Sequence, residues 1–270
     1  MGKYNAGLSP KLDRNSRGCP TLALFDKALP ATCYQRWFSM AEVAPMVIKI
    51  CVVLVSEIFF FAALLFGAAG TVRWPAAWAD LTLFLAGALW ITLRLARRDP
   101  ALLAERLKSP WQKGQPFWDK IWILPMMVAW CAWLVLMGLD AVRFRWSVMP
   151  VWLQCAGAVV LILSFWMIGR VFRENPFLTA VVRIQAERGH RVVSTGPYAT
   201  IRHPLYASML IYLPANALVL GSWAGLAASV VFLGGIVFRT AMEDRELQRG
   251  LSGYTEYAAR VRYRLIPFIW

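Results

Sequence analysis

Residues 204–238 read PLYASMLIYLPANALVLGSWAGLAASVVFLGGIVF, a run of 35 residues without a single Asp, Glu, Lys or Arg. A membrane-spanning helix needs about 20 predominantly apolar residues, so this run is too long for one span unless it is strongly tilted. Gly221 and Ser222 interrupt it near its middle. We therefore predict two short helices, 205–220 and 223–238, that form a tight hairpin.

Four further apolar runs come before this hairpin, each of about the length that crosses a bilayer. They cover residues 46–69, 74–93, 121–139 and 148–169. The whole chain is 59% hydrophobic and 16% charged, whereas soluble domains average about 45–50% and 25%. We therefore predict an all-α, polytopic membrane protein with about six transmembrane helices, the last two forming the hairpin, followed by a cytoplasmic C-terminal helix.

The basic residues alternate in number from one side of the predicted membrane to the other. From the N-terminus through the successive gaps, Lys and Arg number 7, 1, 7, 2, 6, 0 and 6. Because cytoplasmic segments are enriched in Lys and Arg, we expect both termini and the loops 94–120 and 170–203 to face the cytoplasm. Anionic membrane lipids then account for the net charge of +14, and nucleic acid is not an expected partner.

Polarity divides the chain into three regions. Residues 1–45 are predicted to be a polar cytoplasmic arm, 46–169 four transmembrane helices, and 170–270 a loop, the hairpin and the C-terminal helix. The arm is polar and of mixed charge, so we expect no cleavable signal peptide; a bacterial inner membrane and an endoplasmic reticulum fit equally well. The five cysteines form no C-x-x-C pair, and we predict no metal site.

The two histidines of the chain, His190 and His203, both fall in the loop 170–203. Pro204 suits the first position of a helix, where its missing N–H has no partner to lose. Arg202 and His203 would then lie at a helix N-terminus, whose free N–H groups and partial positive charge suit a carboxylate. In the alternative, Arg202 extends to lipid headgroups and His203 only caps the interface.

Beyond the hairpin, helical spacing places Arg239, Glu243 and Glu246 on one face, at i, i+4 and i+7. A hairpin returns its second end beside its first, so we expect this face to lie close to His203. In the alternative, these charges are solvated on an interfacial helix, with Arg239 paired to Glu243. The downstream G-Y-x-x-Y motif at 253–257 suits an amphipathic helix and carries no expected chemistry of its own.

One ionisable residue falls inside a predicted span. Glu57 lies near the middle of the first apolar run, where a charge is costly and by default suggests a function. It either lines a substrate passage or pairs with a buried donor for packing alone. Asp80 and Asp140 lie at span ends and are interpreted as interfacial residues.

The polar elements around the hairpin occur in a specific order. They are G-x-Y-x-x-x-R-H-P-x-Y at 196–206, the hairpin, R-x-x-x-E at 239–243, and G-Y-x-x-Y before a terminal proline. This order resembles the isoprenylcysteine carboxyl methyltransferases and their bacterial relatives. The segment 98–106, which begins R-D-P and ends E-R, together with F-W-D at 117–119, also looks like the bacterial branch.

This resemblance implies an S-adenosyl-L-methionine-dependent methyl transfer to a lipid-like small molecule that enters from the bilayer. It also implies that Arg239 is the catalytic residue and faces the substrate. Carried over by motif, the cofactor-binding residues are Gln185, His190, Arg191, Val192, Val193, Tyr198, His203, Pro204, Leu205, Tyr206 and Glu243. The arguments from the helix N-terminus and from the shared helix face add Arg202 and Glu246, and Glu57 joins Arg239 as a candidate substrate contact.

The chemical nature of the methyl acceptor decides which further groups the reaction needs. A carboxylate is anionic at neutral pH and needs no general base, and a bidentate contact with Arg239 would orient it. An amine would have to lose a proton, and Glu246 or His203 would be the candidate bases. These residues do not decide between the two acceptors; the family resemblance implies carboxyl O-methylation of a prenylcysteine-like acceptor, which is the reaction we expect. A phospholipid or other lipid N-methyltransferase, a non-catalytic membrane binding or transport component, and a sterol-type reductase with a nicotinamide cofactor are the alternatives.

Overall fold

The computed structural model describes the backbone of residues 40–270 and the side chains of residues 46–270. The predicted polar arm, residues 1–45, lies outside the range of described side chains. The chain divides into two units, 1–49 and 50–270. In the first unit, only the first turns of helix α2 (Met40–Ala69) are described; the second unit contains all the features discussed below.

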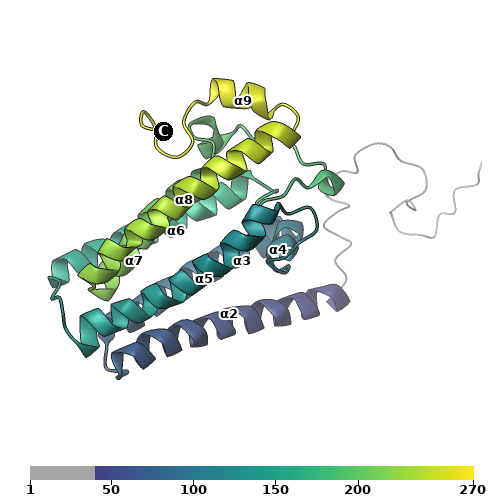
Figure 1. Cartoon of the computed structure of the whole chain (residues 1–270). Coiled ribbons are helices and arrows are strands. Elements are labelled where there is room, and N and C mark those ends of the chain that lie inside the picture. The colour runs from purple at the N-terminus through teal and green to yellow at the C-terminus, as the bar shows by residue number, and fades with distance from the viewer. Residues whose placement is uncertain (1–39) are drawn as a thin grey trace, which may run out of the picture. The chain divides into compact units, whose positions relative to one another are not determined.

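The regular elements between residues 50 and 270 are helices, which confirms the predicted all-α class (Figure 1). Five helical segments are long and apolar enough to cross a membrane: α2, α3 (Pro75–Arg98), α5 (Phe117–Gly138) with the π-turn that extends it, α6 (Val151–Glu174) and α8 (Trp223–Gly250). The fifth predicted span, α7 (Pro204–Leu220), is apolar but only 17 residues long. The short helix α4 (Pro100–Arg106) follows α3.

The hairpin divides at the position that the sequence predicts. Gly221 ends α7 with φ of 76°, a left-handed conformation that glycine adopts without strain. The side chain of Ser222 then accepts a hydrogen bond from the backbone N–H of Gly225 and so caps α8. Local capping signals are sufficient to separate the two helices, because both signals act within a few residues of the break.

Helix α8 continues well beyond the end of the predicted hairpin. It runs for 28 residues, so residues 239–250 extend the same helix and do not form a separate C-terminal helix as expected. No glycine or proline interrupts this stretch before Gly250, and helix breakers are what would have ended it. A separate helix, α9 (Tyr254–Arg260), covers only seven residues.

Helices α6 and α7 pack against each other more extensively than any other pair of described elements. Gly157 of α6 makes this close approach possible. A Cβ atom at this position would lie 2.6 Å from Cβ of Leu218 and 3.0 Å from the backbone nitrogen of Val219. Small residues at helix interfaces let the backbones approach in this way, and the contact fixes α7, which carries part of the site, against α6.

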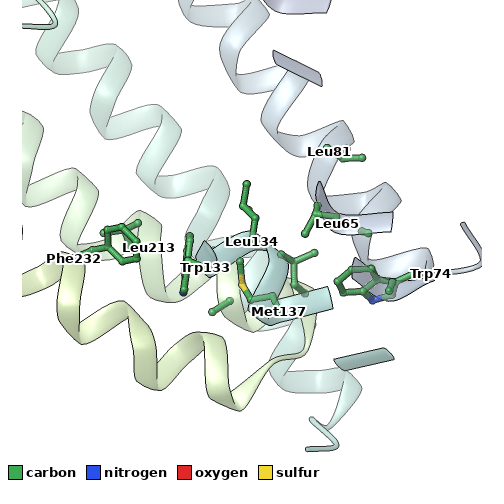
Figure 2. Close-up of a cluster of buried hydrophobic side chains, with 12 residues drawn as sticks. Leu65, Trp74, Leu81, Trp133, Leu134, Met137, Leu213 and Phe232 are labelled. Atoms are coloured by element: carbon green, nitrogen blue, oxygen red, sulfur yellow. The ribbon is translucent and has the colours of Figure 1, made fainter. Parts of the chain in front are cut away.

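The largest apolar cluster of the second unit lies at the α7–α8 turn end of these helices (Figure 2). Leu65 of α2, Trp133 and Met137 of α5, and Phe232 of α8 contribute to it. Nε1 of Trp133 donates a hydrogen bond to the backbone oxygen of Gly225, at 2.7 Å. Packing therefore fixes this end of the hairpin, while the other ends of α7 and α8 carry polar side chains.

Two acidic residues that the sequence suggests are interfacial are instead buried. Asp80 of α3 is 4% exposed and accepts a hydrogen bond from Nδ2 of Asn216, in α7. Asp140, at the end of α5, is fully buried and accepts bonds from Oγ of Ser222 and from the backbone N–H of Ala224. Both carboxylates bind the hairpin, whose polar groups would otherwise be buried without partners.

Candidate active site

A cavity of about 810 Å³, open at its mouth, lies among the loop after α6, the start of α7, the second half of α8, and α9. We refer to it as the polar cavity. The predicted site residues that line it are His190, Arg191, Val192, Val193, Tyr198, Arg202, His203, Leu205, Tyr206, Arg239 and Glu243. Residues more than fifty positions apart in the sequence therefore meet in one cavity, as the hairpin argument predicts.

Four predicted site residues lie outside the lining of the polar cavity. Gln185 is buried beneath it and donates from Nε2 to the backbone oxygen of Phe177, at 2.6 Å. Pro204 is buried as the first residue of α7. Glu246 is partly exposed and lies 3.8 Å from Arg249. Glu57 lines a different, apolar cleft.

Asp244 is the buried carboxylate to which several side chains beside the polar cavity bind, although the sequence did not single it out from its two acidic neighbours. Its side chain is completely buried. Oδ1 and Oδ2 accept from Nε and Nη2 of Arg202, at 2.8 and 2.9 Å. Arg264 donates to Oδ2 at 3.0 Å and Tyr254 to Oδ1 at 2.9 Å, while Nε2 of His203 lies 3.2 Å from Oδ1. Three chain segments are thus joined through one carboxylate.

The predicted role of Arg202 as a free anion-binding group at a helix N-terminus does not match its contacts. Besides Asp244, its guanidinium donates from Nη1 to the backbone oxygens of Val261 and Arg262. The backbone N–H groups of Arg202 and His203 donate to the backbone oxygens of Tyr263 and Arg264, each at 2.9 Å. The segment after α9 therefore occupies the guanidinium group of Arg202 and the backbone N–H groups of residues 202 and 203, and Arg202 ties that segment to α7 and α8.

Glu243 and Tyr206 form a second polar contact inside the cavity. The hydroxyl group of Tyr206 donates to Oε2 of Glu243, at 2.6 Å. The aromatic ring of Tyr206 also stacks on His203, with ring centres 6.0 Å apart. The other oxygen of Glu243 has no hydrogen-bond partner among the described residues and lies at the cavity wall. A carboxylate in this position can accept hydrogen bonds from a bound cation or hydroxyl group.

Arg239 pairs with Asp119 and not with Glu243, the partner considered from the sequence. Nη2 of Arg239 lies 3.0 Å from Oδ1 of Asp119 and donates to the backbone oxygen of Ala180, at 3.1 Å. Asp119 is fully buried at the start of α5, and its Oδ2 accepts from Gln115 and from the backbone N–H of Val182. Asp119 thus orients Arg239. Only the F-W-D resemblance at 117–119 pointed to this residue.

The aromatic residues Tyr254 and Tyr257 of α9, for which the sequence suggests no chemistry, also line the polar cavity. The hydroxyl group of Tyr257 donates to the backbone oxygen of Tyr198, at 2.7 Å, and Nδ2 of Asn175 donates to the Tyr198 hydroxyl, at 2.9 Å. Burial raises the pKa of the Tyr198 hydroxyl. These tyrosines are therefore neutral groups that hold the loop after α6 against α9.

His190 lines the cavity as a neutral imidazole. Its ring stacks on Phe177, with centres 4.6 Å apart, and its Nδ1 accepts from the backbone N–H of Gln185 at 3.3 Å. Burial, together with the nearby charges of Arg188 and Arg183, lowers the pKa of His190 to about 4. The side chain therefore offers an aromatic surface, and a donor only at Nε2, at neutral pH.

A second cavity adjoins the polar cavity on the side of the helices. This central cleft has about 1000 Å³ of empty space and is lined mainly by apolar and aromatic side chains of α5, α7 and α8, such as Trp122, Trp130 and Phe232. Four residues line both spaces: Thr179, Leu205, Tyr206 and Arg239. A polar chamber and an apolar chamber thus meet at a wall that carries an arginine and a tyrosine.

The helices and the two adjoining chambers define an integral membrane protein with a binding site at one end of its helices. Residues 152–252 match the family described as phospholipid methyltransferase. Protein-S-isoprenylcysteine O-methyltransferase B of Arabidopsis thaliana is 28% identical over 126 residues, which cover 44% of this chain and 61% of that relative. The chain thus spans about three fifths of the length of this relative.

Both matches support the resemblance that the motifs predicted, to the isoprenylcysteine and phospholipid methyltransferases. Together with the five long apolar helices found among the described residues, they support an integral multi-pass membrane protein that is similar to these methyltransferases. The matched residues 152–252 include α6, α7 and α8, which position most of the polar cavity. Asp119 and the α9 tyrosines lie outside that match.

Proposed function

We propose that this protein transfers the methyl group of S-adenosyl-L-methionine to a lipid-like acceptor, the carboxylate of a prenylcysteine-like molecule. The observation that carries the proposal is the wall shared by the two chambers, where Tyr206 and Arg239 face both the polar cavity and the apolar central cleft. A polar donor and an apolar acceptor need two such compartments that meet at the reacting atoms.

The residues of the polar cavity fit the cofactor chemically. Glu243 supplies a carboxylate for an ammonium group or for ribose hydroxyls, and Arg191 supplies a cation for a carboxylate. His190 and the apolar side chains of Val192 and Leu251 provide flat and apolar surfaces for an adenine ring. The cofactor, when bound, supplies an activated methyl group.

The protein's own contribution to such a reaction is alignment and exclusion of water. Arg239, fixed by Asp119, would orient an acceptor carboxylate at the boundary between the chambers. Tyr206, fixed by Glu243, would keep the opposite side of that boundary in place. Asp119 and Glu243 both belong to helices, so Arg239 and Tyr206 would already be held in position before the substrate binds.

A second candidate, N-methylation of a phospholipid, is favoured by the family description that residues 152–252 match. An amine acceptor requires a base, and the two bases considered from the sequence are poorly placed for that role. Glu246 lies outside the cavity lining, and His203 is buried against Asp244. Glu243 would be the remaining carboxylate at the wall. These positions favour the carboxyl acceptor.

The orientation predicted from charge would put the polar cavity on the cytoplasmic side, where S-adenosyl-L-methionine is made. The segments that form the cavity include the basic stretches 170–203 and 239–270, which the positive-inside rule assigns to the cytoplasm. The acceptor would then enter the central cleft from the bilayer, and membrane lipids would surround the apolar helices.

The direct test is methyl transfer by the purified full chain in lipid nanodiscs. Labelled S-adenosyl-L-methionine is supplied together with N-acetyl-S-farnesylcysteine in one reaction and phosphatidylethanolamine in another. We expect label in the farnesylcysteine and not in the amine lipid. Label in the amine lipid alone would establish the second candidate. Absence of calorimetric binding of S-adenosylhomocysteine at high micromolar concentration would refute the methyltransferase proposal.

A further inference from the structure

Arg106 lies where the central cleft meets a second apolar cleft. This lateral cleft has about 1220 Å³ of empty space and is lined by residues of α2, α3, α6 and α7, including Glu57. The two clefts share Arg106, Trp130, Leu205, Met209 and Tyr212. Arg106 is the only charged residue among these five, and its position at the end of α4 brings it into an otherwise apolar and aromatic space.

The contacts of Arg106 leave its charge without a counter-ion among the described residues. Its guanidinium lies 4.6 Å from the ring centre of Phe172, and Nη1 reaches the backbone oxygen of Leu178 only at 3.5 Å. Among the side chains of residues 46–270, no carboxylate forms an ion pair with it. The adjacent Glu105 pairs with Arg183 and Lys108 instead.

Two other arginines of the site have counter-ions within the protein. Arg202 pairs with Asp244, and Arg239 pairs with Asp119. Burial lowers the pKa of Arg106 to about 10, which still leaves the side chain protonated at neutral pH. Arg106 is partly buried, and a cation that is withdrawn from water is normally paired, because leaving it without a partner is costly. Among the side chains that the structure describes, none supplies the anion that this charge would pair with.

We propose that Arg106 acts as a second guanidinium group, besides Arg239 of the same central cleft, that binds an oxyanion of the lipid-like methyl acceptor, a carboxylate or a phosphate, while the apolar chain of the acceptor lies in the adjoining clefts. This inference rests on the proposed function, because only that function makes the bound lipid the acceptor of the methyl group. The planar guanidinium matches both oxyanions geometrically. The central cleft also contains Tyr206 and Arg239, so an anion on Arg106 places the acceptor in the chamber that adjoins the polar cavity.

The experiment measures lipid binding separately from cofactor binding. The full chain in detergent is titrated, by native mass spectrometry, with three single-chain lipids of equal length: lysophosphatidic acid, an N-acylated cysteine and neutral monoacylglycerol. The same is done for Arg106→Gln, Arg106→Lys and a control, Arg170→Gln. Arg170 also stacks on an aromatic ring, that of Trp166, but lies outside both clefts. S-adenosylhomocysteine affinity is measured by calorimetry for each variant.

Because a charge-assisted hydrogen bond strengthens binding by about tenfold or more, we expect the wild-type protein to prefer at least one anionic lipid over the neutral lipid by about this factor. Arg106→Gln should reduce this preference to less than about threefold, while Arg106→Lys and Arg170→Gln retain most of it. If lysophosphatidic acid binds more tightly than the N-acylated cysteine, the site recognises a phosphate; the reverse order indicates a carboxylate.

An unchanged anion preference in Arg106→Gln would overturn this inference, and so would a preference lost equally in Arg170→Gln. If Arg106→Gln does not fold, Arg106→Met is measured in its place by the same criterion, and an anion preference unchanged from wild type in that folded variant overturns the inference. Retained lipid preference combined with no binding of S-adenosylhomocysteine in any variant would refute the proposed function and leave the anion site of Arg106 standing.

Discussion

Asp244 holds Arg202 in a bidentate ion pair, with Nε to Oδ1 at 2.8 Å and Nη2 to Oδ2 at 2.9 Å. The two residues are 42 positions apart in the chain, and neither side chain is appreciably exposed. The pair joins the start of α7 to the second half of α8 at the cavity wall. Because the ion pair is buried, we interpret its role as structural. Glu243, one residue before Asp244, lines the cavity instead.

We predict that Asp244→Asn lowers the free energy of unfolding by about 3–5 kcal/mol, because Arg202 and Arg264 would lose their buried counter-ion. The measurement is reversible unfolding in mixed micelles, followed by tryptophan fluorescence. Glu246→Gln is the matched control, since Glu246 lies near the surface and such substitutions usually stay within about 0.5 kcal/mol. Equal stability of the two variants would contradict the anchoring role.

Substitutions of Glu243 and Arg239 should affect different steps: the first should weaken cofactor binding, and the second should lower the rate of methyl transfer. We expect Glu243→Ala to weaken S-adenosylhomocysteine binding by about tenfold or more, because it removes the carboxylate at the cavity wall. Arg239→Ala should leave that affinity nearly unchanged but lower the rate of methyl transfer. Calorimetry and a labelled-methyl assay measure the two quantities. An equal loss of cofactor affinity in both variants would refute this division of roles.

Asp119 should act on turnover through Arg239. In Asp119→Asn an oxygen remains to accept from the backbone N–H of Val182, but the ion pair with Arg239 is lost. Because a misplacement of about 1 Å can cost up to about a hundredfold in rate, we expect turnover to fall at least tenfold with cofactor affinity retained. Asp140→Asn, at the buried turn end of the hairpin, should lower stability alone. Similar turnover losses in both variants would argue against positioning.

The lowered pKa of His190 predicts how the free energy of unfolding depends on pH. Its pKa is lowered to about 4 in the folded protein from 6.5, so the unfolded chain binds more protons between these values. The contribution of His190 to stability is therefore complete above about pH 6.5 and is lost as the pH falls toward 4. Unfolding measured across this window should show a shallower decline for His190→Gln than for wild type. Identical slopes would exclude a buried neutral His190.

The break between α7 and α8 could be predicted from the sequence because its causes are local. Gly221 and Ser222 end one helix and cap the next through contacts within a few residues. The length of apolar runs likewise predicts the helices, since the bilayer imposes one length on all of them. The motif order then indicated the family, and most of the motif residues do line one cavity.

The roles within the acidic stretch 243–246 could not be predicted in this way. Helical spacing groups Glu243 with Glu246, yet Glu246 lies outside the cavity lining, and Asp244 forms the buried centre. Each residue is turned by about 100° from the previous one, so the neighbours of each depend on what packs there. The segment after α9 covers the Asp244 side and brings Tyr254 and Arg264 to it.

The sequence by itself thus determined a helical membrane protein, the position of its hairpin and the family that its motifs resemble, because these depend on composition and on neighbours along the chain. Only the tertiary structure decided that Asp244 neutralises Arg202, that Asp119 orients Arg239, and that Arg106 lies between two apolar clefts without a described counter-ion. Those relationships join side chains distant in sequence, and burial in a shared interior sets which charges are paired.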